Sequence, residues 1–417
     1  METITLLQGK RIVLGVCGSI AVYKAVDLAS KLTQAGAVVD VIMTGAAQRF
    51  VTPLTFQAVT GRPVYTDLWN PAGSGDGLPT HIAHVGLAEG ADLLIVAPAT
   101  ANTLAKLAHG LADNLLSVTA LAARCPLLIA PAMDGDMYEH PAMQDNIDTL
   151  AARGALLVEP ESGRFASGLS GRGRLPETPS LLGHIRRALA RHGPLAGRHV
   201  VVTAGGTREA IDPVRYVSNH SSGKQGTAIA AAALDAGADV TLITSAAQPV
   251  PLGARTVPVD STQQMLDAVL DAVTNADALI MAAAVADFRP ANIATQKIKK
   301  RDDTKGLTLE MVRNPDILLA VKERRAKSGY PRVVVGFAAE SENLLANAGD
   351  KLARKGLDLI VANDITATDA GFSVDTNRVS LLDANGAQEL DLTTKVAVGE
   401  AVVARVAALL GKQHGQA

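Results

Sequence analysis

The densest group of polar side chains in this sequence lies in one connection, DPVRYVSNHSSGK at residues 212–224. Arginine, asparagine, histidine, serine and lysine side chains donate hydrogen bonds, which oxyanions accept. A loop that only joins two elements rarely concentrates so many donors. The composition of this loop therefore favours an anion or nucleotide site that includes Arg215 and Asn219.

Two glycine-rich turns would bring backbone amides to a phosphate. They are GVCGS at 15–19 and AGGT at 204–207, each between an apolar run and a helical pattern. A helix N-terminus binds phosphate through free N–H groups and the helix dipole, and Ser19 would add a hydroxyl. A turn that only needs small residues explains GVCGS equally well. This turn lacks the G-x-G-x-x-G pattern, so NAD is not indicated.

Lysines form two further groups. The run QKIKK at 296–300 follows AAAVAD at 282–287. Lysine is a compact charge on a flexible stem, so such a loop would close over a polyphosphate. The run is also typical of a solvated charge cluster. Lys351 and Lys355 would share one helix face, as they would on any exposed amphipathic helix.

The elements that must position these groups follow a repeated pattern. Residues 11–44 and 199–244 each predict a strand, a turn, a helix and a second strand, so each begins a parallel sheet. Two runs joined by an Asn-Gly turn, 378–383 and 388–392, predict a hairpin. The proline-flanked segment 176–197, which contains the basic, helix-like run LLGHIRRALARHG, is the predicted linker. Other apolar runs predict buried strands at 93–97, 127–130, 155–158, 279–283, 333–337 and 357–362.

The predicted fold class is α/β, with two three-layer α/β/α domains whose sheets are mainly parallel. A chain of 417 residues is too long for one core, and we predict domains at 1–190 and 191–417. A net charge of -2 and 3% aromatic residues argue against a nucleic-acid partner. Two cysteines and the absence of a long apolar run predict a cytoplasmic protein with no membrane partner.

Motifs in the second half resemble phosphopantothenate–cysteine ligase. The segments DPVRYVSNHSSGKQG, AAAVADF, KIKK, VRNPDIL, VVGFAAE and LDLIVAND occur in the family's order and span nearly all of residues 199–405. The resemblance implies that CTP and 4'-phosphopantothenate form an acyl-cytidylate with release of pyrophosphate. The amine of cysteine then displaces CMP to form an amide.

Positions that match the ligase motifs acquire roles through this resemblance. Asn219 corresponds to the residue tied to the acyl-cytidylate, and Arg215 to a substrate-loop residue. Lys297 would act as a catalytic cation on the reacting phosphate, and Asp287 would hold the ribose hydroxyls. Mg²⁺ is implied by the triphosphate rather than by a ligand cluster, so no metal-ligating residue is predicted. The other predicted CTP contacts are Met281, Ala282, Ala283, Pro315, Asp316, Ile317, Leu318, Phe337, Lys351 and Lys355.

The first half resembles the flavin-containing cysteine decarboxylases. The matching segments are GVCGSIAVYK, VIMTGAAQRFV, ADLLIVAPATANTLAKLAHGLADNLL and PAMDGDMY. The resemblance implies a flavodoxin-like domain with FMN, commonly fused in bacteria to a Rossmann-like ligase domain. The thiol of 4'-phosphopantothenoylcysteine would be oxidised to a thioaldehyde, and loss of CO₂ would give an enethiolate. Hydride return from the flavin and a proton from a protein acid would complete 4'-phosphopantetheine.

The flavin resemblance also selects residues. Ser19, Thr44, Thr100 and Asn102 match FMN-contacting positions. The segment THIAHV at 80–85 holds two histidines, and the family histidine precedes the ADL strand by a fixed interval. That interval selects His84 rather than its neighbour three residues earlier as the catalytic histidine.

Two positions depart from the family pattern. The motif P-A-M-N reads PAMD, so Asp134 replaces a substrate-contacting asparagine and would repel the substrate carboxylate unless protonated, turned away or compensated. The flap A-C-G-x-x-G-x-G-R reads ASGLSGRGR, so Ser167 replaces the cysteine acid. An alcohol is a far weaker acid than a thiol with a pKa of ~8.5. Our hypothesis is that Ser167 relays a proton from water while Arg172 or Arg174 polarises the site.

The predicted function is therefore a bifunctional enzyme of coenzyme A biosynthesis. An alternative keeps the ligase but gives the flavoprotein domain altered or lost decarboxylase activity. A regulatory binding protein is disfavoured by the complete ligase motifs, and a nicotinamide oxidoreductase explains neither the lysine loop nor Asn219. The resemblance also implies a homo-oligomer in which trimeric flavin domains, with FMN near the subunit boundary, and dimeric ligase domains build a dodecamer.

Overall fold

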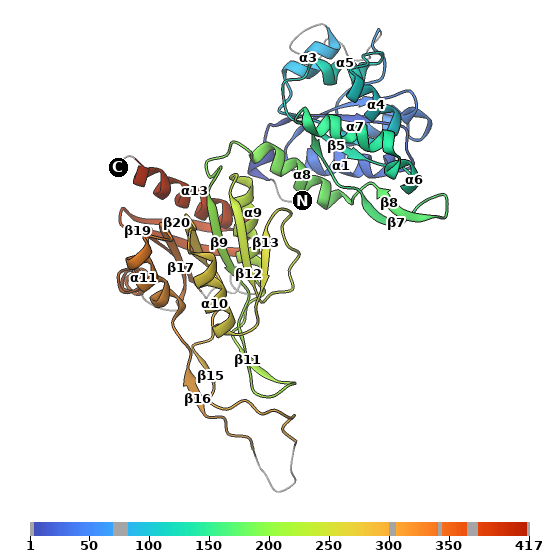
Figure 1. Ribbon diagram of the computed structural model, residues 1–417. Coiled ribbons are helices and arrows are strands. Elements are labelled where there is room, and N and C mark those ends of the chain that lie inside the picture. The colour runs from blue at the N-terminus through green and yellow to red at the C-terminus, as the bar shows by residue number, and fades with distance from the viewer. Residues whose placement is uncertain (1–3, 70–81, 300–305, 341–343, 365–373, 415–417) are drawn as a thin grey trace. The chain divides into compact units, whose positions relative to one another are not determined.

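Each of the two predicted β-α-β units begins its own parallel sheet. The computed structural model describes residues 4–69, 82–299, 306–340, 344–364 and 374–414, and it separates into two units, Met1–Arg191 and His192–Ala417. In both the first unit and the second unit, helices cover the two faces of a mainly parallel sheet (Figure 1). The predicted α/β fold class is confirmed.

The first unit has a six-stranded parallel sheet in the order β3-β2-β1-β4-β5-β6. Its central strands are almost entirely buried, because helices cover both faces of a parallel sheet. The order reverses between β1 and β4, where ligands of doubly wound sheets bind outside the carboxyl ends. The strands are β1 (Arg11–Val16), β2 (Val38–Met43), β3 (Val64–Tyr65), β4 (Leu93–Ala99), β5 (Leu127–Pro131) and β6 (Leu156–Leu157).

Two apolar layers and one hairpin complete the first unit. One layer holds α1 (Val22–Gln34), α2 (Pro53–Thr60) and α8 (Thr178–Ala190) against the sheet. The opposite layer holds α3 (Ala83–Glu89), α4 (Ala101–His109), α5 (Leu115–Ala122) and α7 (Pro141–Ala152). The short helix α6 (Gly135–Glu139) precedes α7, and the 3₁₀ turns are Thr5–Leu7 and Ala47–Arg49. The hairpin of β7 (Glu161–Arg164) and β8 (Ser170–Arg174), here called the flap, follows β6.

The segment predicted as a linker, 176–197, is mostly helix α8. Pro179 lies in its first turn, where a missing backbone N–H breaks no hydrogen bond. Leu181 and Ile185 are fully buried in the core of the first unit. The helix-like run expected in this segment is therefore α8, which packs in the first unit, and the division between the units falls after Arg191, inside the predicted segment.

The second unit has an eight-stranded sheet in the order β13-β12-β9-β14-β17-β18-β19-β20, whose last two strands are antiparallel. The strand order again reverses beside the first strand, between β9 and β14. The hairpin predicted around Asn385-Gly386 is confirmed as β19 and β20. The strands are β9 (His199–Ala204), β12 (Asp239–Thr244), β13 (Arg255–Pro258), β14 (Ala278–Met281), β17 (Val333–Glu340), β18 (Leu359–Asp364), β19 (Thr376–Asp383) and β20 (Gly386–Thr394).

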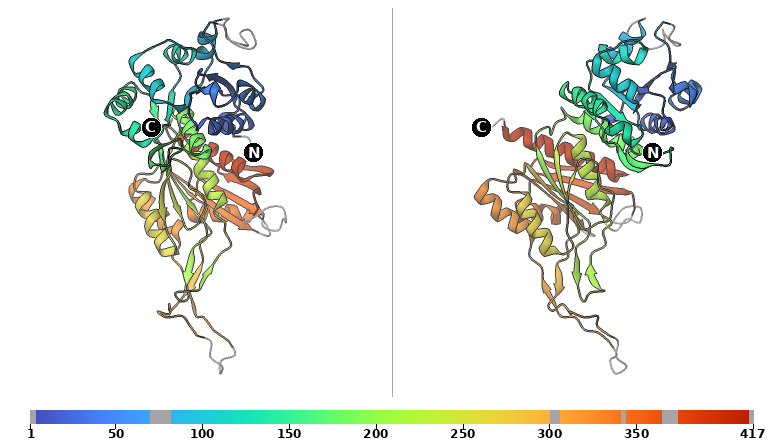
Figure 2. Two further views of the ribbon diagram at one scale, coloured as in Figure 1. Left: turned by 90° about the vertical axis from the view of Figure 1, so that its right-hand side faces the viewer. Right: turned by 45° about the vertical axis from the view of Figure 1, so that its right-hand side comes forward.

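Helices cover both faces of this sheet as well. On one face α9 (Lys224–Asp235) and α13 (Lys395–His414) pack side by side (Figure 2). On the other face lie α10 (Thr262–Ala272), α11 (Ile317–Ser328) and α12 (Leu344–Lys355). Within the described residues, every helix is too short or too polar to cross a bilayer.

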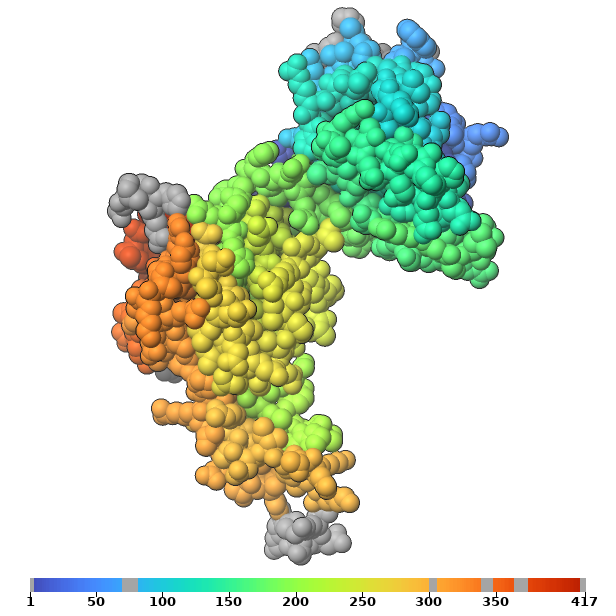
Figure 3. All heavy atoms as spheres, viewed as in Figure 1, coloured from blue at the N-terminus to red at the C-terminus, as the bar shows by residue number. Residues whose placement is uncertain are grey.

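Two small antiparallel pairs project from the second unit and are here called the arm. They are β10 (Arg208–Ala210) with β11 (Tyr216–Ser218), and β15 (Phe288–Pro290) with β16 (Met311–Arg313). The arm includes the described residues that connect these strands, and Figure 3 shows it extending beyond the body of the second unit. The arm carries the donor-rich loop and the described part of the lysine run.

Candidate active sites

A cavity of about 860 Å³ lies at the carboxyl ends of β1, β2, β4 and β5 in the first unit. It is therefore at the point where the strand order reverses, as expected for a ligand site in such a sheet. Six of the seven residues predicted for the first half line this cavity. They are Ser19, Thr44, Thr100, Asn102, Asp134 and Ser167.

Small residues form one wall of this cavity. Gly18 allows the turn after β1 to approach the turn after β2, because a Cβ on Gly18 would lie 2.5 Å from the Cβ of Ala46. The Ser19 hydroxyl accepts a hydrogen bond from the N–H of Ala21 at 3.2 Å, just before α1 begins. Thr44 likewise accepts from the N–H of Ala47 at 3.2 Å. Two hydroxyls and the start of α1 thus lie on this wall of the cavity.

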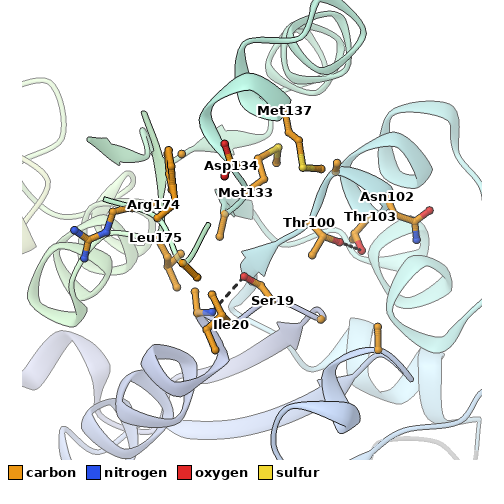
Figure 4. Close-up of a pocket in the computed structure, with 18 of the residues that line it drawn as sticks. Ser19, Ile20, Thr100, Asn102, Thr103, Met133, Asp134, Met137, Arg174 and Leu175 are labelled. Carbon is orange, nitrogen blue, oxygen red and sulfur yellow. Dashed lines mark hydrogen bonds between the residues drawn. The ribbon is translucent and has the colours of Figure 1, made fainter. Parts of the chain in front are cut away.

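The opposite side of the cavity comes from β4 and β5. Thr100 precedes α4 and donates a hydrogen bond to Thr103 at 3.4 Å, and Asn102 lies in the first turn of that helix. Met133 and Asp134 follow β5 and lie across the cavity from Ser19 (Figure 4). Residues that are far apart in sequence therefore meet because parallel strands end at one sheet edge.

The flap brings the two family departures into direct contact. The Ser167 hydroxyl donates a hydrogen bond to Asp134 Oδ2 at 2.6 Å. Behind this contact, the N–H of Met133 donates to the carbonyl of Gly173 at 3.0 Å, which joins β5 to β8. Asp134 is therefore hydrogen-bonded to the flap while it still lines the cavity.

The two arginines proposed to polarise the site and the two cysteines differ in where they lie. Arg172 pairs with Glu159 and lies 5.5 Å from the ring centre of Tyr138, whereas Arg174 does line the cavity. Cys17 is buried and contacts Thr103, and its burial raises the pKa of the thiol. Neither cysteine lines the cavity among the described residues.

His84 is the one first-half prediction that the cavity does not include. It lies half-buried near the start of α3, and α3 packs on α5. Its alternative, His81, lies outside the described residues. Within one copy of the chain, the geometry therefore assigns His84 no contact with the space lined by Ser19 and Asp134.

Two adjoining cavities, of about 570 and 740 Å³, lie at the carboxyl ends of the second sheet. They share Ala283, Asp287, Phe337 and Lys351. Asn219 and Ala282 line the smaller one. The larger one is lined by the other predicted positions Met281, Pro315, Asp316, Ile317, Leu318 and Lys355. All but two of the predicted ligase residues are thus adjacent.

Asn219 is fixed against the strand-end segment of β14. Its side-chain amide donates to the carbonyl of Val285 at 3.0 Å. Gly206 permits this approach, because a Cβ there would lie 2.6 Å from the Asn219 carbonyl oxygen. The donor-rich loop after β10 therefore turns one amide toward the segment that also carries Asp287.

The predicted nucleotide-contacting turn is the start of α11. Asp316 caps the helix, because its carboxylate accepts from the N–H of Leu319 at 3.2 Å. Lys355 makes an ion pair with Asp316, and Lys351 donates to the carbonyl of Phe337 at 2.8 Å. Burial lowers the pKa of Lys355, while the nearby Asp287 carboxylate raises it. The two lysines do share one face of α12.

Arg215 and Lys297 lie on the arm and do not line either cavity among the described residues. Asp212 accepts from Arg215 Nε at 2.9 Å and from the N–H of Ile298 at 3.1 Å. Arg215 also donates to the carbonyl of Ile298 at 2.8 Å. Arg215 therefore fixes the segment that carries Lys297, and its pairing lowers the pKa of Asp212 well below the ordinary range.

Sequence reasoning missed several cavity residues. Lys24 is buried, lines the first cavity and donates to the carbonyl of Leu175 at 2.7 Å. In the smaller second cavity, Lys224 pairs with Asp375 at 2.6 Å, and burial lowers the pKa of Lys395. Their partners are remote in sequence, so no local pattern identifies them. One acceptor there, Asn363 Oδ1, is buried and makes no hydrogen bond with the described residues.

Comparisons with known proteins cover both units. A family described as "Flavoprotein" matches residues 2–190, and "DNA/pantothenate metabolism flavoprotein C-terminal domain" matches residues 195–410. The coenzyme A biosynthesis bifunctional protein CoaBC of Bacillus subtilis is 46% identical over 417 residues, which is 99% of this chain and 100% of that one. Its counterpart in Mycobacterium tuberculosis is 47% identical over 91% of each chain.

One similar solved structure covers part of the chain. An FMN-dependent cysteine decarboxylase, SpaF, is 37% identical, with 42% of this chain and 94% of that chain covered and a TM-score of 0.37.

Proposed function

The chain belongs to the family of coenzyme A biosynthesis bifunctional proteins, and from this premise we propose how its cavities divide the two reactions. It is a bifunctional enzyme with decarboxylase and ligase activities, and its first unit is a flavoprotein domain. The observation that carries the assignment is that, within each half, residues selected by motif from distant parts of the sequence meet around the cavities of that half.

The first cavity is the site for FMN and for 4'-phosphopantothenoylcysteine. The residues fit such a group, because Gly18 lets the turns after β1 and β2 pack closely at the edge of the cavity, and the start of α1 suits a phosphate. When bound, FMN would supply the reversible two-electron oxidation of the substrate thiol. Ser19, Thr44, Thr100 and Asn102 would bind and orient it, and the flap would cover the substrate.

The two adjoining cavities of the second unit are the site for CTP and 4'-phosphopantothenate. Asp287 would accept the ribose hydroxyls, and Phe337 with the start of α11 would contact the base. Asn219 would hold the acyl-cytidylate, and the ammonium of Lys297 would offset charge at the reacting phosphate when the arm closes. The described residues offer no cluster of three acidic, histidine or cysteine ligands, so Mg²⁺ would enter with the triphosphate.

Both sites are completed by further copies of the chain. Ile20, Tyr23 and Met137 line the first cavity although more than half of each is exposed, an arrangement that suits coverage by a partner. The arm exposes Val214, Tyr216 and Ile293 in the same way. We expect light scattering after gel filtration to give a closed oligomer of trimers and dimers, whereas a monomer would contradict this part of the proposal.

A mixing experiment tests whether His84 acts across a subunit boundary. His84→Ala and Ser19→Ala variants would be coexpressed, so that some boundaries in the mixed oligomer combine an intact His84 with an intact Ser19. Decarboxylation should recover in the mixture, because each variant supplies what the other lacks. Equal loss in separate and mixed samples would show that both residues act within one copy.

One coupled assay tests the paired activities. The protein would receive 4'-phosphopantothenate, cysteine and CTP, and pyrophosphate and CO₂ would be measured together. We expect pyrophosphate first and CO₂ only after it, since the amide is the substrate of the first unit. Replacing CTP with other nucleotides and removing Mg²⁺ would test those two assignments, and pyrophosphate release without either would contradict them.

A further inference from the structure

The two residues that depart from the decarboxylase pattern touch each other. Ser167 Oγ lies 2.6 Å from Asp134 Oδ2, and both side chains line the first cavity. They are 33 residues apart and come from different elements, the flap and the connection after β5. Asp134 stands where the family motif has an amide, and Ser167 stands where it has a thiol. In this chain the carboxyl and the hydroxyl form one hydrogen-bonded pair that lines the cavity.

The backbone holds this pair in place. Gly135 and Gly171 bring the start of α6 against β8, with their Cα atoms close enough that a Cβ on Gly171 would lie 3.6 Å from the Cα of Gly135. At the flap tip, Gly168 donates to the carbonyl of Phe165 at 3.1 Å and adopts φ +90°, which closes the turn around Ser167. The contact therefore follows from the packing of two segments.

A hydroxyl alone is a poor acid, but a carboxyl behind it changes the chemistry. A substrate carboxylate that enters this cavity would lie near Asp134, and two carboxylates share a small space most easily with a proton between them. When CO₂ leaves, one of those charges disappears. A proton held between the two carboxyl groups would then stay with Asp134, next to a hydroxyl that lines the same cavity.

We propose that Asp134 and Ser167 together deliver the proton that replaces the departing carboxylate. The inference rests on the proposed decarboxylase function of this cavity. In the structure Ser167 donates to the Asp134 carboxylate, and protonation of Asp134 would reverse this hydrogen bond. The Asp134 carboxyl O–H would then donate to Ser167 Oγ, while the Ser167 O–H bond breaks and a C–H bond forms at the carbon that lost CO₂. The carbon–carbon double bond of the enethiolate supplies the electron pair, carbon–sulfur double bonding is restored, and Asp134 ends as a carboxylate.

Asp134→Asn is the most informative variant. Asparagine keeps the size of the side chain and is the residue of the family motif, so substrate should still bind. Without the carboxyl, CO₂ release should stop after about one equivalent per site, with the unsaturated thiol accumulating. Steady-state formation of 4'-phosphopantetheine should fall about 10²- to 10⁴-fold, the usual range for loss of a general acid. Ser167→Ala should stop at the same stage.

The double variant Asp134→Asn with Ser167→Cys should recover turnover, because it recreates the amide and thiol of the family pattern. Asp136→Asn and Ser170→Ala are matched controls on the same two segments, since neither side chain lines the cavity, and both should turn over normally. All variants would be compared by CO₂ yield, saturated product and the ultraviolet absorbance of the unsaturated thiol.

Two outcomes would contradict proton delivery by Asp134 and Ser167. Asp134→Asn with normal turnover would mean that Arg164 or Arg174, which also line the cavity, balance the substrate carboxylate instead. Arrest before any CO₂ appears would place Asp134 in substrate binding alone. If the unaltered enzyme released no CO₂, the proposed function itself would fail and this inference with it, an outcome that the first measurement distinguishes from the other two.

Discussion

The two units use the same sheet edge but close their sites differently. In the first unit, a short flap lies on its own cavity through backbone and side-chain contacts. In the second unit, the segment with Lys297 lies on an arm whose described residues do not line either cavity. In each unit, residues at the strand ends form the fixed part of the site. The groups proposed to complete the site lie on the flap or on the arm, outside the main sheet. Strand topology therefore determines where the binding cavity lies, but it does not determine where the flap or the arm carries the groups that complete the site.

Among the variants that compare the two units, the largest effect is expected when a fixed group of the second unit alone is changed. Asn219→Asp replaces the amide that donates to Val285 with a carboxylate that cannot donate. Ligation should fall about 10²- to 10³-fold, as for loss of a transition-state donor, with the acyl-cytidylate accumulating. Decarboxylation of supplied 4'-phosphopantothenoylcysteine and the flavin absorbance should stay unchanged.

The exposed substitution Asn275→Asp serves as the control. Equal loss of both activities would show that the units are not independent.

A matched pair of glycine variants compares the two strand-end turns. Gly18→Ala would place a Cβ 2.5 Å from the Cβ of Ala46, and Gly206→Ala would place one 2.6 Å from the carbonyl oxygen of Asn219. Such overpacking costs about 1–3 kcal/mol. We expect Gly18→Ala to lower flavin content and Gly206→Ala to lower ligation, each roughly tenfold by the tenfold per 1.4 kcal/mol relation.

Absorbance at the flavin band and pyrophosphate release would be measured on both proteins, with Gly411→Ala, which meets open space, as the control. Loss of ligation in Gly18→Ala, or loss of flavin in Gly206→Ala, would contradict the separation of the two sites.

A smaller effect is expected when the arm is loosened. Asp212→Asn removes the ion pair with Arg215 and weakens the contact with Ile298, so the segment that carries Lys297 loses its anchor. We expect a severalfold loss of ligation, within the roughly tenfold that one hydrogen-bonded charge contributes, and faster proteolysis of residues 291–299. Asp271→Asn, on the exposed surface of α10, should leave both unchanged. Unaltered proteolysis would show that the arm is held by other contacts.

The smallest effect concerns pH. Because Arg215 lowers the folded pKa of Asp212 below the unfolded value of ~3.9, the anchor is complete above that unfolded value and is lost only as pH falls through the folded pKa. Proteolysis of the arm should therefore be constant from about pH 5 to pH 8, once the protease's own pH dependence is corrected with an unstructured peptide. A step inside that window would point to another titrating group.

The sequence predicted the parts of this molecule that depend on local pattern. Apolar runs located the strands, and parallel strands ending at one edge brought together Ser19, Thr100 and Asp134 from separate motifs. Local sequence pattern does not predict which distant residue a side chain contacts. The contact between Ser167 and Asp134 and the pairing of Lys224 with Asp375 arise from packing between distant segments.

The segment 176–197 shows the same limit. Its helix-like run was visible in the sequence, but the packing of that helix in the first unit follows only from the burial of Leu181 and Ile185. His84 stays a prediction, because it does not line the first cavity within one copy of the chain.

Helix α8 has a practical meaning for anyone who divides this gene. Its buried leucine and isoleucine belong to the first unit, so a stop codon placed at the proline-rich stretch near residue 176 would leave an apolar groove open to solvent. A stop codon after Arg191 keeps that helix with its own core. The short stretch after α8 is therefore the place at which to divide the chain. The two units could then be produced separately, fused to other proteins or immobilised individually.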